Sequence, residues 1–155
     1  MIGLRNLIDH VLWADATALA AIATLPDSSP EHSQAERLYA HLAAAAHIWY
    51  ARLEGRPPSH PVWPDLPIDE ARTLAGESLN GLRDWAAKGP EALATVIEYR
   101  TSTGQPFRNT VADVITQVVL HGSYHRGQLA LLVRQGGGTP VNTDYILYAR
   151  NGACS

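Results

Sequence analysis

The chain has 155 residues, and its 46% hydrophobic content is typical of one globular domain that is large enough to bury a core. Its 12 Lys and Arg residues and 15 Asp and Glu residues give a formal net charge of −3, and no basic block offers a surface for a phosphate backbone. Nucleic acid is therefore not an expected partner. The single cysteine, Cys154, excludes an internal disulfide and a thiolate metal cluster. We expect one domain over residues 1–155, with any metal held by nitrogen and oxygen atoms.

Residues 4–25 are predicted to form the first helix. One face of this helix carries residues at three- and four-residue intervals: Leu4, Leu7, Ile8, Val11, Leu12, Asp15, Ala18, Leu19 and Ile22. Asp15 is the only polar member of this face, and Pro26 ends the helix. Charged residues interrupt the segment, so it has neither a signal-peptide core nor the run of about 18–20 apolar residues that a membrane span requires. We expect no membrane partner and a cytoplasmic location.

Two further helices are predicted on either side of a proline-rich connection. The second helix begins at Pro30, where Ser28 or Ser29 can cap it, and extends to Gly55. The connection, GRPPSHPVWPDLP, has five prolines within 13 residues, so it can form neither a helix nor a central strand. We expect it to cross the surface as a long ordered segment. The third helix is predicted over 69–88, before Gly89 and Pro90.

The only strand pattern lies between the third and fourth helices. Residues 94–101 and 105–109 are rich in β-branched and aromatic side chains around a turn, which predicts a short hairpin. Thr110 and Asp113 then form a capping-box pattern, and the fourth helix is predicted to extend to Gln135. Four helices of about 20 residues predict an all-α four-helix bundle with a short β-hairpin between helices three and four.

The fourth helix contains two histidines in the run HGSYHRGQL. His121 and His125 are four residues apart, so their side chains leave the helix one turn apart, about 6 Å from each other. Their face also carries Val114, Val118 and Leu132, which indicates that both imidazoles point inward. A divalent metal would bind two buried neutral imidazoles and satisfy their ring nitrogens. The alternative is a pair that is hydrogen-bonded to neighbours without any metal.

His47 in the second helix is the expected third ligand. It shares a face with small residues that would allow close helix approach or leave space for a ligand: Ala40, Ala43, Ala44 and Ala51. His41 lies about 120° around the same helix from His47. His10, His32, His41 and His60 are expected at the surface.

Three neighbours of the histidine pair have separate expected roles. Gln128 shares the histidine face, where its amide would orient a ligating histidine or a bound water, or form a simple buried hydrogen bond. Arg126 points about 120° away and is expected to pair with a carboxylate such as Asp144. Gly127 costs a helix about 1 kcal/mol relative to alanine, so close packing against another helix or subunit is expected there.

The segment from Tyr99 to Tyr148 resembles the C-terminal half of the DinB-like superfamily. Its residues 121–128 match the H-x-x-x-H-R-G-Q signature of that superfamily in full, and Trp13-Ala14-Asp15 and the histidine-containing second helix agree with the first half. The resemblance implies a four-helix bundle that holds one divalent metal through His47, His121 and His125. Zinc, nickel, iron, manganese and cobalt are all compatible with such a site.

The resemblance also implies a class of chemistry, although no catalytic residue is assigned. Three neutral ligands leave an open position on the metal, and relatives include metal-dependent S-transferases and isomerases that use low-molecular-weight thiols. We expect transfer of such a thiol to a small-molecule substrate, with Trp13 and Trp49 near the pocket. The alternatives are a metal-dependent hydrolase, for which Asp15 and Glu54 are the available general bases, and a non-catalytic metal- or ligand-binding protein. The resemblance further implies a homodimer, for which the first helix with Trp13 is a suitable face.

Overall fold

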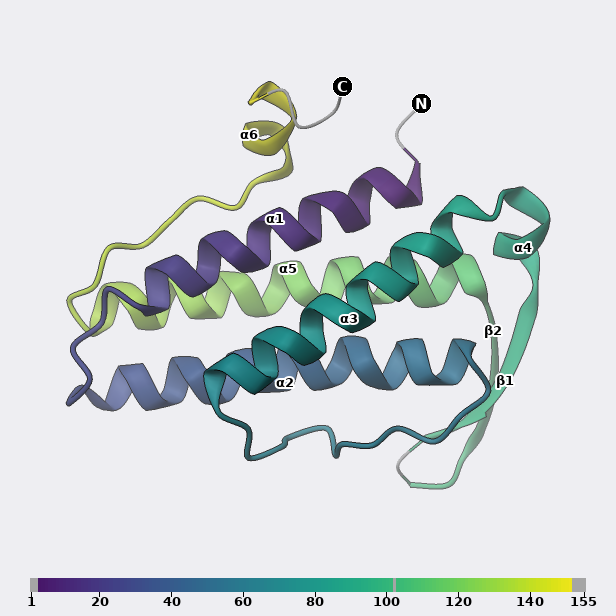
Figure 1. Cartoon of the computed structure of the whole chain (residues 1–155), viewed down its shortest axis with the longest axis horizontal. Coiled ribbons are helices and arrows are strands. Elements are labelled where there is room, and N and C mark those ends of the chain that lie inside the picture. The colour runs from purple at the N-terminus through teal and green to yellow at the C-terminus, as the bar shows by residue number, and fades with distance from the viewer. Residues whose placement is uncertain (1–2, 102, 152–155) are drawn as a thin grey trace.

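The computed structural model describes residues 3–101 and 103–151, so Cys154 lies outside the described residues. Helices and one hairpin make up the ordered elements (Figure 1): α1 (Leu4–Ile22), α2 (Pro30–Leu53), α3 (Ile68–Ala87), α4 (Pro90–Ala94), β1 (Val96–Arg100), β2 (Pro106–Thr110), α5 (Val111–Gln135) and α6 (Tyr145–Arg150). The predicted all-α bundle with a hairpin before the last long helix is confirmed. The short helices α4 and α6 were not predicted.

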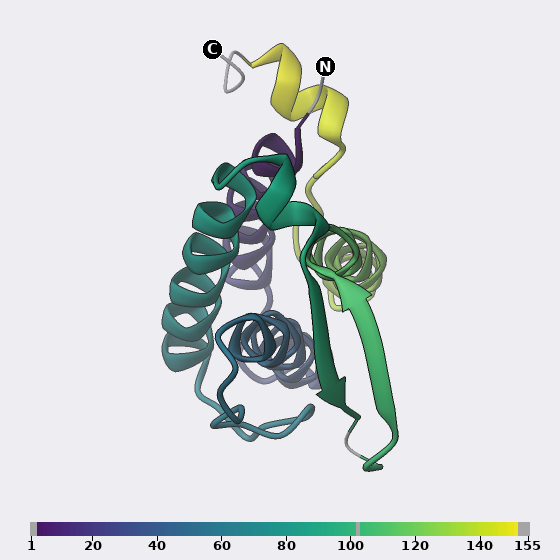
Figure 2. The same cartoon turned by 90° about the vertical axis from the view of Figure 1, so that its right-hand side faces the viewer.

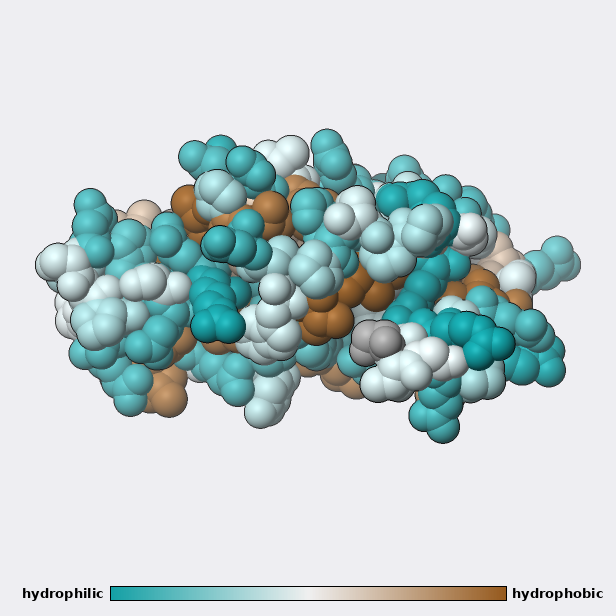
Figure 3. All heavy atoms as spheres, turned by 90° about the horizontal axis from the view of Figure 1, so that it is seen from below, coloured by the Kyte–Doolittle hydropathy of each residue, from teal (hydrophilic) through white to brown (hydrophobic). Residues whose placement is uncertain are grey.

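The four long helices form the bundle, as the end view shows (Figure 2). Helices α1 and α2 each pack against both α3 and α5, so they occupy opposite corners. The apolar faces of all four meet in the middle, where Ile8, Leu79, Leu82 and Ile115 are at most 2% exposed. No described helix has the length and apolar character that crossing a membrane requires. Polar side chains cover most of the lower face, where apolar atoms appear in separate patches (Figure 3).

Local sequence signals set the beginnings of α2 and α5. The Ser29 hydroxyl accepts a hydrogen bond from the His32 amide, and Pro30 follows at the first helical position. The Thr110 hydroxyl accepts from the Asp113 amide, and the Asp113 carboxylate accepts from the Thr110 amide. This reciprocal arrangement confirms the predicted capping box. It begins α5 directly at the end of β2, which positions the histidine-bearing part of the helix.

The hairpin connects α4 to α5 and packs on the C-terminal half of α2. Its strands pair antiparallel from Val96 with Thr110 to Arg100 with Pro106. The Tyr99 ring lies 5.2 Å from the Trp49 ring of α2, measured between centroids. The Arg52 guanidinium lies over both rings, 4.3 and 4.5 Å from their centroids. Trp49 therefore contacts the hairpin in addition to the bundle.

The C-terminal segment returns along α1 and places α6 against it (Figure 1). His10 is 4% exposed, its Nε2 lies 2.8 Å from the Thr143 carbonyl oxygen, and its ring contacts Tyr145 and Tyr148. The expectation that His10 lies at the surface is therefore wrong. Trp13 packs on Tyr148 with 5.6 Å between ring centroids, so α6 contacts the part of α1 that was expected to suit a subunit interface.

Candidate metal centre

Helices α2 and α5 bring three imidazoles together near the middle of the bundle. The His41 Nε2 lies 3.2 Å from His121 Nε2 and 3.3 Å from His125 Nε2. The rings of His121 and His125 are 4.4 Å apart between centroids, as their four-residue spacing on α5 predicted. One nitrogen from each of the three residues lies within 4.8 Å of the other two. We call these residues the histidine cluster.

The third imidazole of the cluster is His41, where the sequence analysis expected His47. The two residues are six positions apart on α2, which separates them by about 120° around the helix and about 9 Å along it. His41 is 5% exposed, so its expected place at the surface is wrong. The small residues beside His47 pointed to its face of α2, whereas in the structure the face that carries His41 lies beside His121 and His125. Apolar residues at three- and four-residue spacing from His41, such as Leu38 and Ala44, were the signal that could have found it.

His47 is equally buried but has other partners. Its Nε2 accepts hydrogen bonds from the Ser59 amide at 3.1 Å and from the Ser59 hydroxyl at 3.0 Å. The His60 ring packs edge-on against it, 5.6 Å away between centroids. These contacts join α2 to the connection over residues 54–67, which returns along the length of α2 (Figure 1). In this structure the Nε2 lone pair of His47 is directed at Ser59.

Hydrogen bonds at Nδ1 determine which ring nitrogen of His41 and of His125 carries the proton. The His41 Nδ1 lies 2.8 Å from the Val62 carbonyl oxygen, which only accepts, so Nδ1 carries the proton. The His125 Nδ1 lies 2.6 Å from the Gln128 Oε1, which also accepts. Both residues therefore direct an unprotonated Nε2 toward the centre. Of the roles considered for Gln128, orienting a histidine of the cluster agrees with this contact.

The donor set fits one divalent cation. Two unprotonated nitrogens that face each other across 3.3 Å repel unless a proton or a cation lies between them. A tetrahedral ion with bonds of about 2.0–2.1 Å separates its ligand nitrogens by about 3.3–3.4 Å, close to the observed spacing. Burial lowers the pKa of His121 to about 4, with His125 and His41 adding to the effect, and burial also lowers the pKa of His41. Near neutral pH these two imidazoles are therefore in the form that binds a metal.

Two aromatic side chains flank the outer side of the cluster. The Trp63 ring stacks on the His41 ring at 3.9 Å between centroids and an interplanar angle of 12°. The Tyr124 ring meets the His125 ring edge-on at 5.1 Å. Both remain more than half exposed. A small molecule that reaches the cluster from this side would therefore meet aromatic surface before the imidazoles.

A buried ion pair lies beside the cluster, between α1 and α5. The Arg126 guanidinium donates to the Asp15 carboxylate at 2.9 Å, and both residues are at most 8% exposed. The expected pairing of Arg126 with Asp144 is therefore wrong, and the one polar residue on the α1 face has its partner here. A Cβ added at Gly122 would lie 2.8 Å from an Arg126 nitrogen, so the glycine provides room for the guanidinium. Burial raises the pKa of Asp15, and Arg126 opposes that effect.

Neither of the carboxylates considered as a general base is free of a partner. Asp15 is paired with Arg126, and the Glu54 carboxylate accepts a hydrogen bond from the Trp85 indole at 2.6 Å. The cluster itself contains histidines only. Trp49 and His121 line the same narrow cavity in the bundle, together with Asp15 and Arg126. Because His121 belongs to both, this cavity lies directly beside the cluster.

These features define a helical bundle in which three histidines from two helices can hold one divalent metal ion. The profile of the DinB family matches residues 2–152, so the chain belongs to the DinB family. Among characterised proteins, Protein DinB of Bacillus subtilis (strain 168) is 34% identical over 58 residues, which cover 37% of this chain. The match spans only 34% of the length of that relative. No solved structure matches the chain significantly.

Proposed function

We propose that the chain binds one divalent metal ion through the Nε2 atoms of His41, His121 and His125. The observation that carries this proposal is the convergence of the three nitrogens, with Val62 and Gln128 accepting from the outer nitrogens of His41 and His125. A site with three neutral nitrogen ligands retains the full charge of the ion and leaves a position for a further ligand. Zinc, nickel, iron, manganese and cobalt all suit imidazole nitrogens.

We further propose that the metal activates a low-molecular-weight thiol for transfer to an electrophilic small molecule. A bound divalent ion lowers the pKa of a coordinated thiol, which supplies a thiolate at neutral pH without a protein cysteine. The paired states of Asp15 and Glu54 support this reaction over hydrolysis, because a hydrolase needs a base to accept a proton from water. The exposed face of Trp63, which stacks on the His41 ring, would hold an apolar substrate against the cluster.

Two turnover assays distinguish a thiol transferase, a hydrolase and a non-catalytic metal-binding protein. Metal-loaded protein should consume an epoxide or a haloarene faster when a low-molecular-weight thiol is present, and His121→Ala should lose that rate. His32→Ala is the matched control, because His32 lies at the start of α2 and outside the cluster. Metal-dependent cleavage of esters or amides without thiol transfer would favour a hydrolase. No turnover in either assay would favour a non-catalytic metal-binding protein.

We also propose that the chain forms a homodimer through the outer face of α5. Leu120, Tyr124 and Leu131 are 63%, 67% and 52% exposed and lie on one stripe of the helix. Gly127 lies on the same stripe, and a Cβ there would meet nothing within 4 Å. The close approach that Gly127 was expected to allow is therefore not made within the described chain. A second copy of the chain is the occupant that this stripe suits.

Two copies of this stripe can pack against each other, because large residues of one copy would face small residues of the other. A two-fold axis near Tyr124 with antiparallel helices would place Leu120 of one copy opposite Gly127 of the other. The same axis would bring Asp113, at the start of α5, near Arg134, at its end. Sedimentation should show a dimer for the wild type and a monomer for Leu120→Glu. Phe107→Glu is the control, since Phe107 is an exposed apolar residue of the hairpin. A wild type that stays monomeric at high concentration would contradict the proposal.

A further inference from the structure

A cleft of about 420 Å³ opens between α1 and α3, with α2 at its base. Its walls are mainly small and aliphatic side chains, including Ala16, Leu19 and Gly76. Its polar groups come from Asp15, Tyr39 and Arg72. None of the three histidines of the cluster lines this cleft. The volume lies within the range of about 300–1,000 Å³ that is typical of sites for small molecules.

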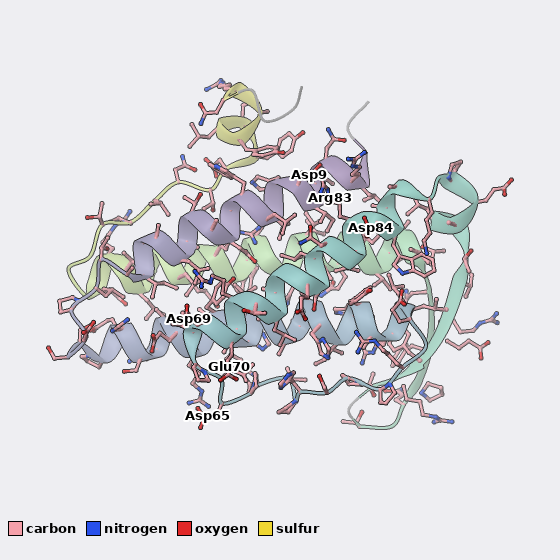
Figure 4. The ribbon with its side chains drawn as sticks, viewed as in Figure 1. Asp9, Asp65, Asp69, Glu70, Arg83 and Asp84 are labelled. Atoms are coloured by element: carbon pink, nitrogen blue, oxygen red, sulfur yellow. The ribbon has the colours of Figure 1, made fainter. Side chains whose placement is uncertain are left out.

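The two helices that form the cleft are held together at one end. Arg83 of α3 lies 2.6 Å from the Asp9 carboxylate of α1, and Figure 4 shows this pair near the start of α1. Seven residues further along α1 lies Ala16, and seven residues back along α3 lies Gly76, so the two face each other about 10 Å from the ion pair. Small residues at this point leave the space between the helices open.

Gly76 has no local structural reason to be glycine. It lies inside α3, its φ is not positive, and a Cβ there would meet nothing within 4 Å. Glycine in a helix interior costs about 1 kcal/mol relative to alanine. Neither a turn nor a close helix contact accounts for this cost. The observable consequence of the glycine is a deeper cleft.

Two oxygen atoms in the cleft have no hydrogen-bond partner among the residues that the structure describes. Tyr39 is 1% exposed, yet its hydroxyl makes no hydrogen bond with any residue that the structure describes. Asp15 pairs with Arg126 through Oδ1, and no described residue donates to its Oδ2. An apolar site with an unpaired hydroxyl loses free energy unless a ligand or water satisfies that group. Arg72, which also lines the cleft, already has a partner, Asp69, at 3.1 Å.

We propose that this cleft binds a small apolar alcohol. The ligand hydroxyl would donate to Asp15 Oδ2 and accept from the Tyr39 hydroxyl, so one group satisfies both. Its apolar body would lie against Ala16, Leu19 and Gly76. A neutral ligand fits better than a cationic one, because Arg126 already balances the charge of Asp15. This site is separate from the histidine cluster, and the proposal does not depend on metal binding.

Gly76→Leu provides a sharp test, because Gly76 lines the cleft and a Cβ there would meet nothing within 4 Å. Wild-type protein should bind 2-naphthol saturably in a fluorescence titration, and Gly76→Leu should weaken binding at least tenfold while the melting temperature stays equal or rises. Asp84→Leu is the control, since Asp84 is an exposed residue of α3 outside the cleft (Figure 4). Equal binding by wild type and Gly76→Leu, or no binding by the wild type, would overturn the site.

The class of ligand is tested by changing single groups. Tyr39→Phe should weaken 2-naphthol binding several-fold and leave naphthalene binding unchanged, because it removes only the hydroxyl. The anion 2-naphthoate should bind more weakly than 2-naphthol, since its carboxylate would face Asp15. If naphthalene bound as tightly as 2-naphthol and Tyr39→Phe bound both equally, the assignment to an alcohol would be wrong. His41→Ala should bind 2-naphthol like the wild type, which separates this site from the proposed metal centre.

Discussion

His41 and His47 lie on the same helix, are equally buried at 5% exposure, and both contact the connection over residues 54–67. Their hydrogen bonds run in opposite directions. His41 donates through Nδ1 to the Val62 carbonyl, which leaves Nε2 open toward the other two histidines. His47 accepts through Nε2 from Ser59, which occupies that lone pair within the protein. Burial alone therefore does not distinguish the two histidines, whereas the direction of the Nε2 lone pair does.

We propose that His47 positions the connection that carries Val62 and Trp63. Ser59, which His47 holds, precedes Val62 by three residues and Trp63 by four. Val62 orients the His41 ring and Trp63 stacks on it. In this role His47 would stabilise the segment that contacts His41, without contributing a nitrogen to the cluster.

The largest expected effect is the loss of metal from His41→Ala. Removing one of three ligands should reduce bound metal from one equivalent to near zero, because two imidazoles on one helix do not hold an ion strongly. Elemental analysis of protein purified without a His-tag or a nickel column measures this content. His121→Ala and His125→Ala should behave alike, and His32→Ala should retain the metal. Full metal content in His41→Ala would remove that residue from the site.

Gln128→Leu should weaken metal binding without abolishing it. The change removes the acceptor for the His125 Nδ1 proton, and loss of such an orienting contact typically costs about 10- to 100-fold in affinity. Competition with a chelator measures the affinity. Gln128→Glu keeps an acceptor oxygen and should stay close to the wild type. If both variants bound equally weakly, the hydrogen bond would not be the cause.

His47→Ala should keep one equivalent of metal with an affinity about 10-fold lower, at the lower end of the effect of an orienting contact. It frees Ser59 and loosens the segment that carries Val62 and Trp63. The same chelator competition applies, and the fluorescence of Trp63 should report its altered stacking on His41. A loss of metal as complete as in His41→Ala would contradict the distinction between the two histidines.

The smallest expected effect is a change in the pH dependence of folding. Burial lowers the pKa of His47 from its ordinary value of 6.5, with Arg56 and His60 adding to the effect and Glu77 opposing it. The unfolded chain therefore takes up the His47 proton at a higher pH than the folded chain, so the free energy of unfolding should decrease as the pH falls below 6.5. His47→Ala should show a shallower decrease between pH 6.5 and 5 in urea titrations. Identical slopes would show that His47 does not titrate in this way.

Local sequence signals predicted most of the fold. They did not predict contacts between residues far apart in the sequence. The Thr110 and Asp113 capping box and the close approach of His121 to His125 depend on neighbours within four residues, so the sequence was sufficient. Whether His41 or His47 lies beside His121 and His125 depends on which face of α2 meets α5, and only tertiary packing sets that face. Asp15 was recognised as the odd polar residue of its helix face, but its partner Arg126 is 111 residues away.

The central claim is tested most directly by a crystal structure of metal-loaded protein with an anomalous difference map at the absorption edge of the metal. We expect one peak, with bonds of about 2.0–2.2 Å to the Nε2 atoms of His41, His121 and His125, and with His47 still hydrogen-bonded to Ser59. A peak bonded to His47, or metal-loaded crystals without a peak between α2 and α5, would contradict the account.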